Sequence, residues 1–257
     1  MGTWPGLTFR AEGTVGVLEL ARPHKRNALD DGTVASLHAF FAAPPPEIRA
    51  VVLCGAGEHF SAGLDLSEIS ERGTFEGVTH SMQWHRAFEA LEFGTVPVVA
   101  ALHGAVIGGG LELAAACHVR VAEPSAFYAL PEGQRGIFIG GGGAVRLPRL
   151  IGAARVMDMI LTGRVYDAQA GAAIGISQYL CDGGEGRRTA IELAAKIAGN
   201  APLSNFAVMH ALPRIADAAP EVGYLTEALV SAIAQSDPEA KARVEDFLRK
   251  REPKLRE

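Results

Sequence analysis

The sequence predicts an α/β fold followed by a helical C-terminal region. Up to about residue 150, short apolar runs alternate with segments of helical periodicity, a pattern typical of strands joined by helical crossovers. From about Gly152 onward, the apolar residues recur mainly at helical spacing. The composition changes between Gly175 and Gly186. We therefore expect an α/β core over residues 1–185 and a helical region over residues 186–257.

The expected strands are short and mostly apolar. A continuous apolar run such as 50–54 is typical of a strand that is buried on both faces. In chain order, the expected strands cover residues 7–10, 15–20, 50–54, 98–102, 119–122 and 126–128.

The expected helices follow capping residues or glycines. Asp30 is a candidate N-cap for the first of them, and the prolines at 44–46 end it. The apolar face of this helix consists of Val34, Leu37, Phe40 and Phe41. The other expected helices cover residues 82–93, 111–116, 153–161, 167–174, 187–198, 203–216, 221–235 and 239–250.

Composition excludes several classes of protein. The chain has 257 residues, of which 48% are hydrophobic, and this is enough for a full core. With 24 Lys and Arg against 29 Asp and Glu, the net charge is −5, so the chain lacks the basic surface of a nucleic-acid-binding protein. The longest uncharged stretch, 93–111, contains Pro97, His103 and five glycines, and we expect no membrane span.

The cysteines and the N-terminal residues favour a cytoplasmic protein. Cys54, Cys117 and Cys181 are too few and too scattered for a disulfide framework or a zinc site, so we expect no metal. The first ten residues contain no basic segment followed by an apolar run, which a secretory signal requires.

Several common catalytic motifs are missing from the sequence. There is no dinucleotide-binding G-x-G-x-x-G after a strand, no phosphate-binding loop, no G-x-S-x-G and no H-E-x-x-H. His103 and His118 lie beside the ends of expected elements, and we favour structural hydrogen bonding over catalysis for both.

Two glycine-containing segments, 59–66 (HFSAGLDL) and 103–113 (HGAVIGGGLEL), each lie between an expected strand and an expected helix. Their small residues allow the backbone to bend, and the first turn of a helix leaves N–H groups without partners. One N–H from each segment can meet at a single oxygen and form an oxyanion hole. The alternative is that these glycines serve only tight turns.

Two glutamates are candidate acid–base groups. Glu112 lies in the first turn of the helix that follows the glycine triplet, among apolar neighbours, and Glu132 lies in the segment Leu-Pro-Glu-Gly. The common alternative for a glutamate is a solvated surface charge. A helix N-terminus favours the ionised form of Glu112 and burial favours the protonated form, so the direction of its pKa shift is open.

These motifs resemble those of the crotonase superfamily, the enoyl-CoA hydratase/isomerase family, over residues 22–251. The family's first oxyanion segment has the form S/A-A-G-x-D and its second contains G-G-G. One catalytic Glu follows the triplet by two residues, and another follows in a P-E segment twenty residues later. Residues 61–65, 108–110, 112 and 132 match this order and spacing.

The resemblance implies an α/β crotonase (ClpP-like) spiral of ββα units, with a helical C-terminal region that forms a homotrimer or homohexamer. It implies an oxyanion hole from the N–H groups of Leu64 and Gly109, and catalytic roles for Glu112 and Glu132. An acyl-CoA thioester is the implied substrate, with no separate cofactor. The implied substrate-binding residues are Lys25, Arg26, Ala62, Leu64, Asp65, Gly108 and Gly109, and Lys250 or Arg251 is expected to reach a CoA phosphate.

The expected reaction is the addition of water to a trans-2-enoyl-CoA. Isomerisation of 3-enoyl-CoA to 2-enoyl-CoA, another crotonase-type acyl-CoA reaction, and a catalytically silent acyl-CoA-binding protein are the alternatives. The chain departs from the family pattern at Leu64, where Ala is common, at Ile139, where Pro is common, and over residues 133–135.

Overall fold

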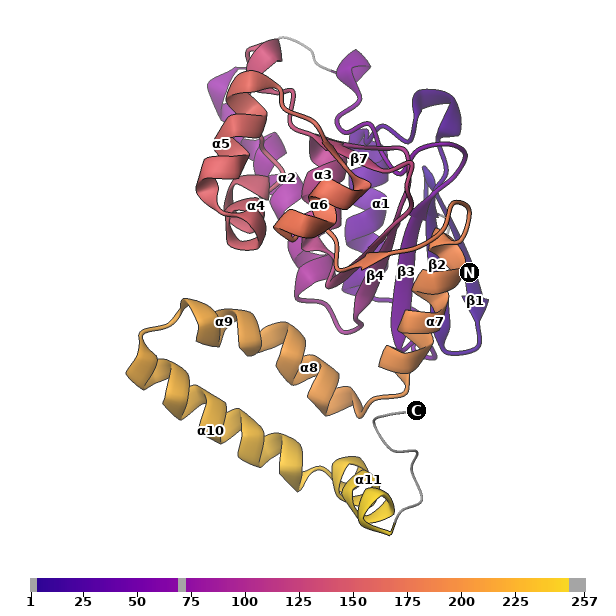
Figure 1. The fold of residues 1–257 in the computed structure, drawn as a ribbon, viewed down its shortest axis with the longest axis vertical. Helices are drawn as coiled ribbons and strands as arrows, with labels where there is room; N and C mark the ends of the chain where they lie inside the picture. The colour runs from indigo at the N-terminus through magenta and orange to yellow at the C-terminus, as the bar shows by residue number, and fades with distance from the viewer. Residues whose placement is uncertain (1–3, 69–72, 250–257) are drawn as a thin grey trace. The chain divides into compact units, whose positions relative to one another are not determined.

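The computed structural model describes residues 4–68 and 73–249 and divides the chain into two compact units, Met1–Ala198 and Gly199–Glu257 (Figure 1). In the described part of the first unit, the main sheet has the strand order β1-β2-β3-β4-β6-β9. Its strands are β1 (Leu7–Glu12), β2 (Val15–Leu20), β3 (Ala50–Gly55), β4 (Val98–Leu102), β6 (Val119–Ala122) and β9 (Tyr179–Leu180). The pair β1–β2 is antiparallel, and the other neighbours are parallel.

A repeated ββα unit builds the core around the site. Strands β4 and β6 join the main sheet, and the strand after each of them, β5 (Ala105–Ile107) or β7 (Phe127–Ala129), joins a smaller sheet with β8 (Tyr166–Asp167). The helix after β5 is α3 (Gly109–Ala116), and that after β7 is α4 (Gly143–Ile151). The predicted α/β core of ββα units is thereby confirmed.

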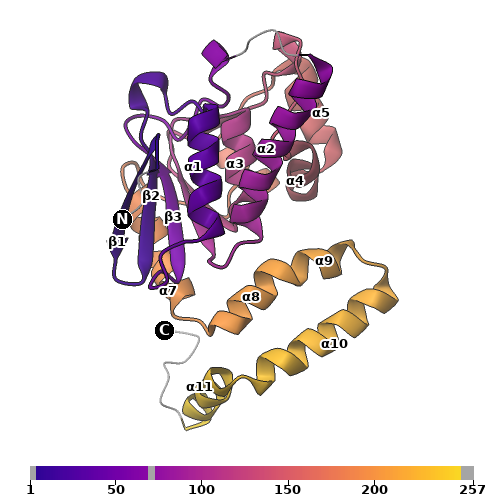
Figure 2. The same cartoon turned by 180° about the vertical axis from the view of Figure 1, so that it is seen from behind.

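The main sheet is covered on both faces. Helix α7 (Gly186–Ala198) lies on one face in Figure 1, and α1 (Asp31–Ala42), α2 (Thr74–Glu92) and α3 lie on the other in Figure 2. Side chains alternate between the two faces along each strand, as the pleat requires. In β2, Val15 and Val17 pack with the α7 side, whereas Leu18 and Leu20 pack with the side of Phe40 and Phe88.

The structure differs from the sequence expectations in several elements of the first unit. Helix α7 belongs to this unit, because Ala190, Ala194 and Ala198 form a stripe of small buried residues against the sheet. The boundary between the two units therefore lies at the end of α7, after Ala198, whereas the expected boundary at 185/186 lies at its start. Strand β5, which lies between glycines, and helix α4, which contains Pro148, were not among the expected elements. The remaining helices of the unit are α5 (Ala153–Thr162) and α6 (Ala168–Ile174), with 3-10 turns η1 (Pro23–Lys25), η2 (Leu66–Glu68) and η3 (Gly133–Arg135).

The second unit is helical. Its helices are α8 (Pro202–His210), α9 (Leu212–Asp217), α10 (Pro220–Ser236) and α11 (Pro238–Leu248). The single helix expected over 203–216 is broken at Ala211, because Pro213 has no N–H to continue the ladder of hydrogen bonds. Assembly into a trimer or hexamer stays a prediction. In the part of the chain that the structure describes, no helix is long and apolar enough to cross a membrane.

Candidate active site

The two glycine-containing segments lie side by side at the ends of their strands. The N–H of Ser61 donates to the carbonyl of Ala105 at 2.9 Å, and the N–H of Ile107 donates to the carbonyl of Ser61 at 3.1 Å. Beyond this pairing, a Cβ added to Gly63 would lie 3.0 Å from the nitrogen of Gly109, and one added to Gly109 would lie 3.5 Å from the nitrogen of Leu64. Glycine at 63 and 109 is therefore what allows the two backbones to approach each other this closely.

The two predicted donors are unoccupied by other protein groups. Leu64 and Gly109 line the same cavity, and among the described residues neither main-chain N–H donates to another protein group. Gly109 is the first residue of α3, where N–H groups have no partner within the helix. The structure thus places two free donors next to each other, as an oxyanion hole requires.

Asn27 links the turn at 22–27 to the first glycine-containing segment. It is 1% exposed, with a positive φ of 53°, and its amide nitrogen donates to the carbonyls of Ala56 (2.8 Å) and His59 (2.7 Å). Its amide oxygen accepts the N–H of Arg22 at 3.0 Å. This buried amide fixes the turn 22–27 against the segment that carries Leu64.

Asp65 holds the other end of the same segment. The Ser67 hydroxyl donates to its carboxylate at 2.6 Å, and the Arg22 guanidinium lies 2.8 Å away. The Ser67 hydrogen bond and then Arg22 lower the pKa of Asp65 to about 2, so the group is a carboxylate at neutral pH. Its contacts lie within the protein, which gives Asp65 a role in shaping the loop; substrate binding by this residue stays a prediction.

The predicted CoA-binding residues of the turn at 22–27 and of the first segment lie together. The N–H of Ala62 donates to the carbonyl of Arg26 at 3.0 Å, and the Lys25 ammonium lies 3.8 Å from the Asp65 carboxylate. Lys25 and Arg26 are both exposed. Lys250 and Arg251 lie outside the described residues.

Glu112 is buried in α3 and held by main-chain donors. One of its carboxylate oxygens accepts the N–H groups of Gly141 and Gly143, each at 2.8 Å. Burial raises the pKa of Glu112, and these two hydrogen bonds oppose that rise only in part. The sequence left the direction of this pKa shift open; in the structure, the effect of burial is larger than that of the hydrogen bonds.

Glu132 is also buried, but without such support. It follows β7, is 8% exposed, and one of its carboxylate oxygens has no hydrogen-bond partner among the described residues. Its other oxygen lies against Gly108, since a Cβ added there would come within 2.5 Å of it. Burial raises the pKa of Glu132 to about 7, with a further contribution from the negative charge of Glu112.

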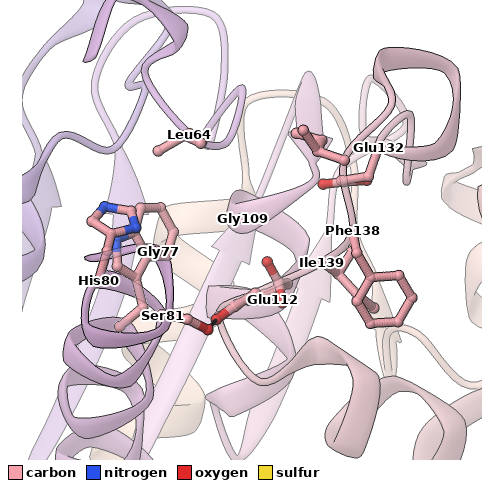
Figure 3. Close-up of a pocket in the computed structure, with 13 residues that line it drawn as sticks. Leu64, Gly77, His80, Ser81, Gly109, Glu112, Glu132, Phe138 and Ile139 are labelled. Atoms are coloured by element: carbon pink, nitrogen blue, oxygen red, sulfur yellow. Dashed lines mark hydrogen bonds between the residues drawn. The ribbon is translucent and has the colours of Figure 1, made fainter. Parts of the chain in front are cut away.

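Both glutamates and both free donors line one cavity of about 480 Å³. Figure 3 shows the side chains of Glu112 and Glu132 turned toward this space, with Leu64 and His80 across it. The walls are mainly apolar and are formed by Leu64, Trp84, Ile137, Phe138 and Ile139. An apolar cavity with a few convergent polar groups is typical of a small-molecule site.

Sequence reasoning missed the contribution of α2 to the cavity. This helix supplies Gly77, His80, Ser81 and Trp84, at the i, i+3, i+4, i+7 spacing of one helix face. The expected helix began at residue 82, too late to show that face. The His80 imidazole lies 2.7 Å from the Asp31 carboxylate, and the Ser81 hydroxyl donates to the carbonyl of Gly140 at 2.6 Å.

The two histidines expected to be structural bond to the main chain. His103 contacts the carbonyl of Gly57 at 3.0 Å. His118 accepts the N–H of Val98 at 2.9 Å and contacts the carbonyl of Glu92 at 3.0 Å. The structural interpretation is confirmed for both.

The chain is similar to several known proteins. The family model for enoyl-CoA hydratase/isomerase matches residues 10–257. The short-chain-enoyl-CoA hydratase of Clostridium acetobutylicum is 37% identical over 196 residues, which is 75% of each chain. The fatty acid oxidation complex subunit alpha of Shewanella loihica is 43% identical over 155 residues, 59% of this chain but 22% of that longer protein.

A solved structure from Rhodopseudomonas palustris CGA009 has 56% sequence identity and a TM-score of 0.94, covering 98% of this chain and 97% of that one. The family match includes every residue that forms the cavity, and the structural likeness covers nearly the whole chain. The chain belongs to the enoyl-CoA hydratase/isomerase family of the crotonase superfamily, and it is an enzyme of that family.

Proposed function

We propose that the protein hydrates trans-2-enoyl-CoA thioesters. The observation that carries this proposal is the presence of two buried carboxyl groups and two free main-chain donors on one cavity. In the proposed mechanism, the N–H groups of Leu64 and Gly109 donate to the thioester oxygen. They polarise the conjugated system, so that the β-carbon becomes electrophilic. A donor of this kind contributes about 3 kcal/mol to lowering the barrier.

The two carboxyl groups then divide the proton transfers. Glu132, with a pKa near 7, is protonated in a large share of molecules at neutral pH and supplies the proton that forms the α-carbon–hydrogen bond. Glu112 accepts a proton from the water whose oxygen bonds to the β-carbon. Net transfer of one proton from Glu112 back to Glu132, directly or through solvent, restores the starting state.

Isomerisation of a 3-enoyl-CoA is the nearest alternative reaction. It needs the same pair of donors but only one acid–base group, for which Glu132 is the matching position. The support for hydration is that Glu112 is also held on the cavity wall by two N–H groups, an arrangement that isomerisation does not require.

The test measures turnover of crotonyl-CoA and of a 3-enoyl-CoA by the wild-type protein and by Glu112→Gln and Glu132→Gln. We expect each substitution to lower kcat for hydration by about 1,000-fold, because each removes one proton-transfer group. Glu89→Gln, an exposed position on α2, is the control and should retain wild-type kcat. Full hydratase activity in either cavity variant contradicts the two-carboxylate mechanism. Turnover of the 3-enoyl thioester alone indicates an isomerase, and binding of acyl-CoA without any turnover indicates a silent binding protein.

A further inference from the structure

Arg146 is a buried cation next to the cavity that the proposed mechanism does not use. It lies on α4 and is 8% exposed. Its Nε donates to the carboxylate of Glu92, at the end of α2, at 2.6 Å. Its Nη1 donates to the carbonyl oxygen of Gly141 at 3.2 Å. The guanidinium therefore joins the last residue of α2 to the loop that precedes α4.

That loop is the one that holds Glu112. The N–H groups of Gly141 and Gly143 both donate to the Glu112 carboxylate, while the carbonyl of Gly141 accepts from Arg146. Gly142, between them, has a positive φ of 93°, and a Cβ there would collide with the guanidinium. Residues 141–143 thus lie between the Glu112 carboxylate and the Arg146 guanidinium and contact both.

The charge of Arg146 acts on the same carboxylate. The charged or titratable groups that face Glu112 are Arg146 from α4, His85 from α2, and Glu132 from the segment after β7. Arg146 and His85 favour the ionised form of Glu112. The negative charge of Glu112 in turn raises the pKa of Glu132. Arg146 therefore affects both the position of the Glu112 carboxylate and its protonation.

We propose that the Glu92–Arg146 ion pair is a positioning device for the general base: it fixes residues 141–143 so that their N–H groups hold the Glu112 carboxylate toward the reacting water. This inference rests on the proposed function, in which Glu112 takes a proton from that water. Arg146 itself touches no substrate in this account. A purely structural alternative is that Arg146 only ties α2 to α4.

The main experiment compares Arg146→Met, Arg146→Lys and Glu92→Gln with Arg149→Met, an exposed arginine on the same helix. For Arg146→Met, we expect kcat to fall about 100-fold, as a misplaced reacting group can cause, while KM changes less than about threefold. Lysine keeps the charge but cannot donate to Glu92 and Gly141 with the same planar geometry, so Arg146→Lys should recover little of kcat. Glu92→Gln should show a smaller loss, and Arg149→Met none.

The pH profile of kcat distinguishes positioning of Glu112 by Arg146 from a purely structural role of Arg146. Arg146 favours the ionised form of Glu112. In Arg146→Met, the acidic limb of the kcat–pH profile should therefore move to higher pH by about one unit. Arg146→Lys should move it less. A wild-type acidic limb in Arg146→Met, together with wild-type kcat, overturns the inference. Thermal unfolding of each variant identifies any that fail to fold; if Arg146→Met does, Arg146→Lys and Glu92→Gln decide by the same two measurements.

A double-substitution cycle gives the sharpest readout. In a Glu112→Gln background, Arg146→Met should cause little additional loss of kcat, because its effect passes through Glu112. If the two losses multiply instead, Arg146 acts independently of Glu112 and the inference is wrong.

A failed proposed function is distinguishable from a failed inference. If the wild-type protein hydrates crotonyl-CoA but Arg146→Met behaves as Arg149→Met does, only the inference fails. If the wild-type protein hydrates no thioester, the proposed function fails, and crystal structures of wild type and Arg146→Met then decide on positioning alone. A Glu112 carboxylate that leaves Gly141 and Gly143 supports positioning, and one that stays in place contradicts it.

Discussion

Glu112 and Glu132 line the same cavity, but the chain surrounds their carboxyl groups differently. Glu112 accepts two N–H groups from a loop that Arg146 braces, whereas Glu132 has one buried oxygen without a partner among the described residues. Burial raises the pKa of both groups. At Glu112, two main-chain hydrogen bonds oppose that rise in part and fix the orientation of the carboxylate. At Glu132, no such hydrogen bonds stabilise the carboxylate, so the protonated form is favoured and the group can donate its proton.

Of the variants outside the glutamates and Arg146, the largest effect is expected from Gly108→Ala, because its new side chain meets the Glu132 carboxylate. Gly108 has a φ of 53°, which disfavours alanine, and the new Cβ would lie 2.5 Å from a Glu132 oxygen. We expect kcat for crotonyl-CoA to fall at least about 100-fold, since the acid group must move away from its position. Steady-state kinetics of the purified variant measure this.

Gly13→Ala is the matched control for backbone strain. Gly13 has a similar φ of 63°, but no atom lies within 4 Å of an added Cβ. This variant should lose some thermal stability and keep its kcat. If Gly108→Ala retains activity within about threefold of wild type, Glu132 is not held against the glycine triplet as described.

A middle-sized effect concerns stability and its dependence on pH. Because the pKa of Glu132 rises from its usual 4.5 to about 7 on folding, the folded state binds this proton more tightly than the unfolded state. Wild-type stability therefore falls as pH rises from about 4.5 to 7, and the loss is complete above pH 7. Glu132→Gln removes this loss, so its Tm should exceed that of wild type at pH 8 by about 2–4 °C and approach the wild-type value near pH 4.

Glu112→Gln sharpens the same comparison. It too removes a buried charge, but it also removes the charged acceptor for Gly141 and Gly143, so its gain at pH 8 should be smaller than that of Glu132→Gln. Thermal unfolding of both variants at several pH values checks the order. A Glu132→Gln protein that is less stable than wild type at pH 8 would show that an unidentified partner stabilises the carboxylate.

The smallest effect is expected from Leu64→Ala. The donor at this position is the main-chain N–H, which alanine keeps, so kcat for crotonyl-CoA should change less than about threefold. The shorter side chain enlarges the cavity at one of its apolar walls. The value of kcat/KM should therefore rise for longer or branched acyl chains relative to crotonyl-CoA. Equal, large losses on all chain lengths would contradict a main-chain role for Leu64.

Those parts of the site that depend on short motifs were predictable from sequence. Glu112 and Glu132 were candidates from their place in the sequence, and the resemblance to the family implied Leu64 and Gly109 as donors. The structure brings all four to one cavity. The resemblance assigned Arg26 and Ala62 to the same ligand, and in the structure these two residues are joined by a main-chain hydrogen bond. The catalytic roles of these residues stay predictions.

Contacts between distant elements were not predictable. Glu92 and Arg146 are 54 positions apart, and nothing in either local sequence indicates the other. The helix that carries Arg146 was missed because it follows a run of glycines and contains Pro148. Helix α7 was assigned to the wrong side of the boundary, because its helical periodicity is visible in the sequence but the sheet it packs on is not.

The two free donors at Leu64 and Gly109 come from the peptide backbone, and this limits how the site can change. Most single amino-acid replacements at Leu64 alter the size of the chamber and leave both N–H groups in place. The glutamates, by contrast, can each be exchanged in one step. A protein with this framework can therefore change its proton-transfer groups while the two proposed donors to the thioester carbonyl remain.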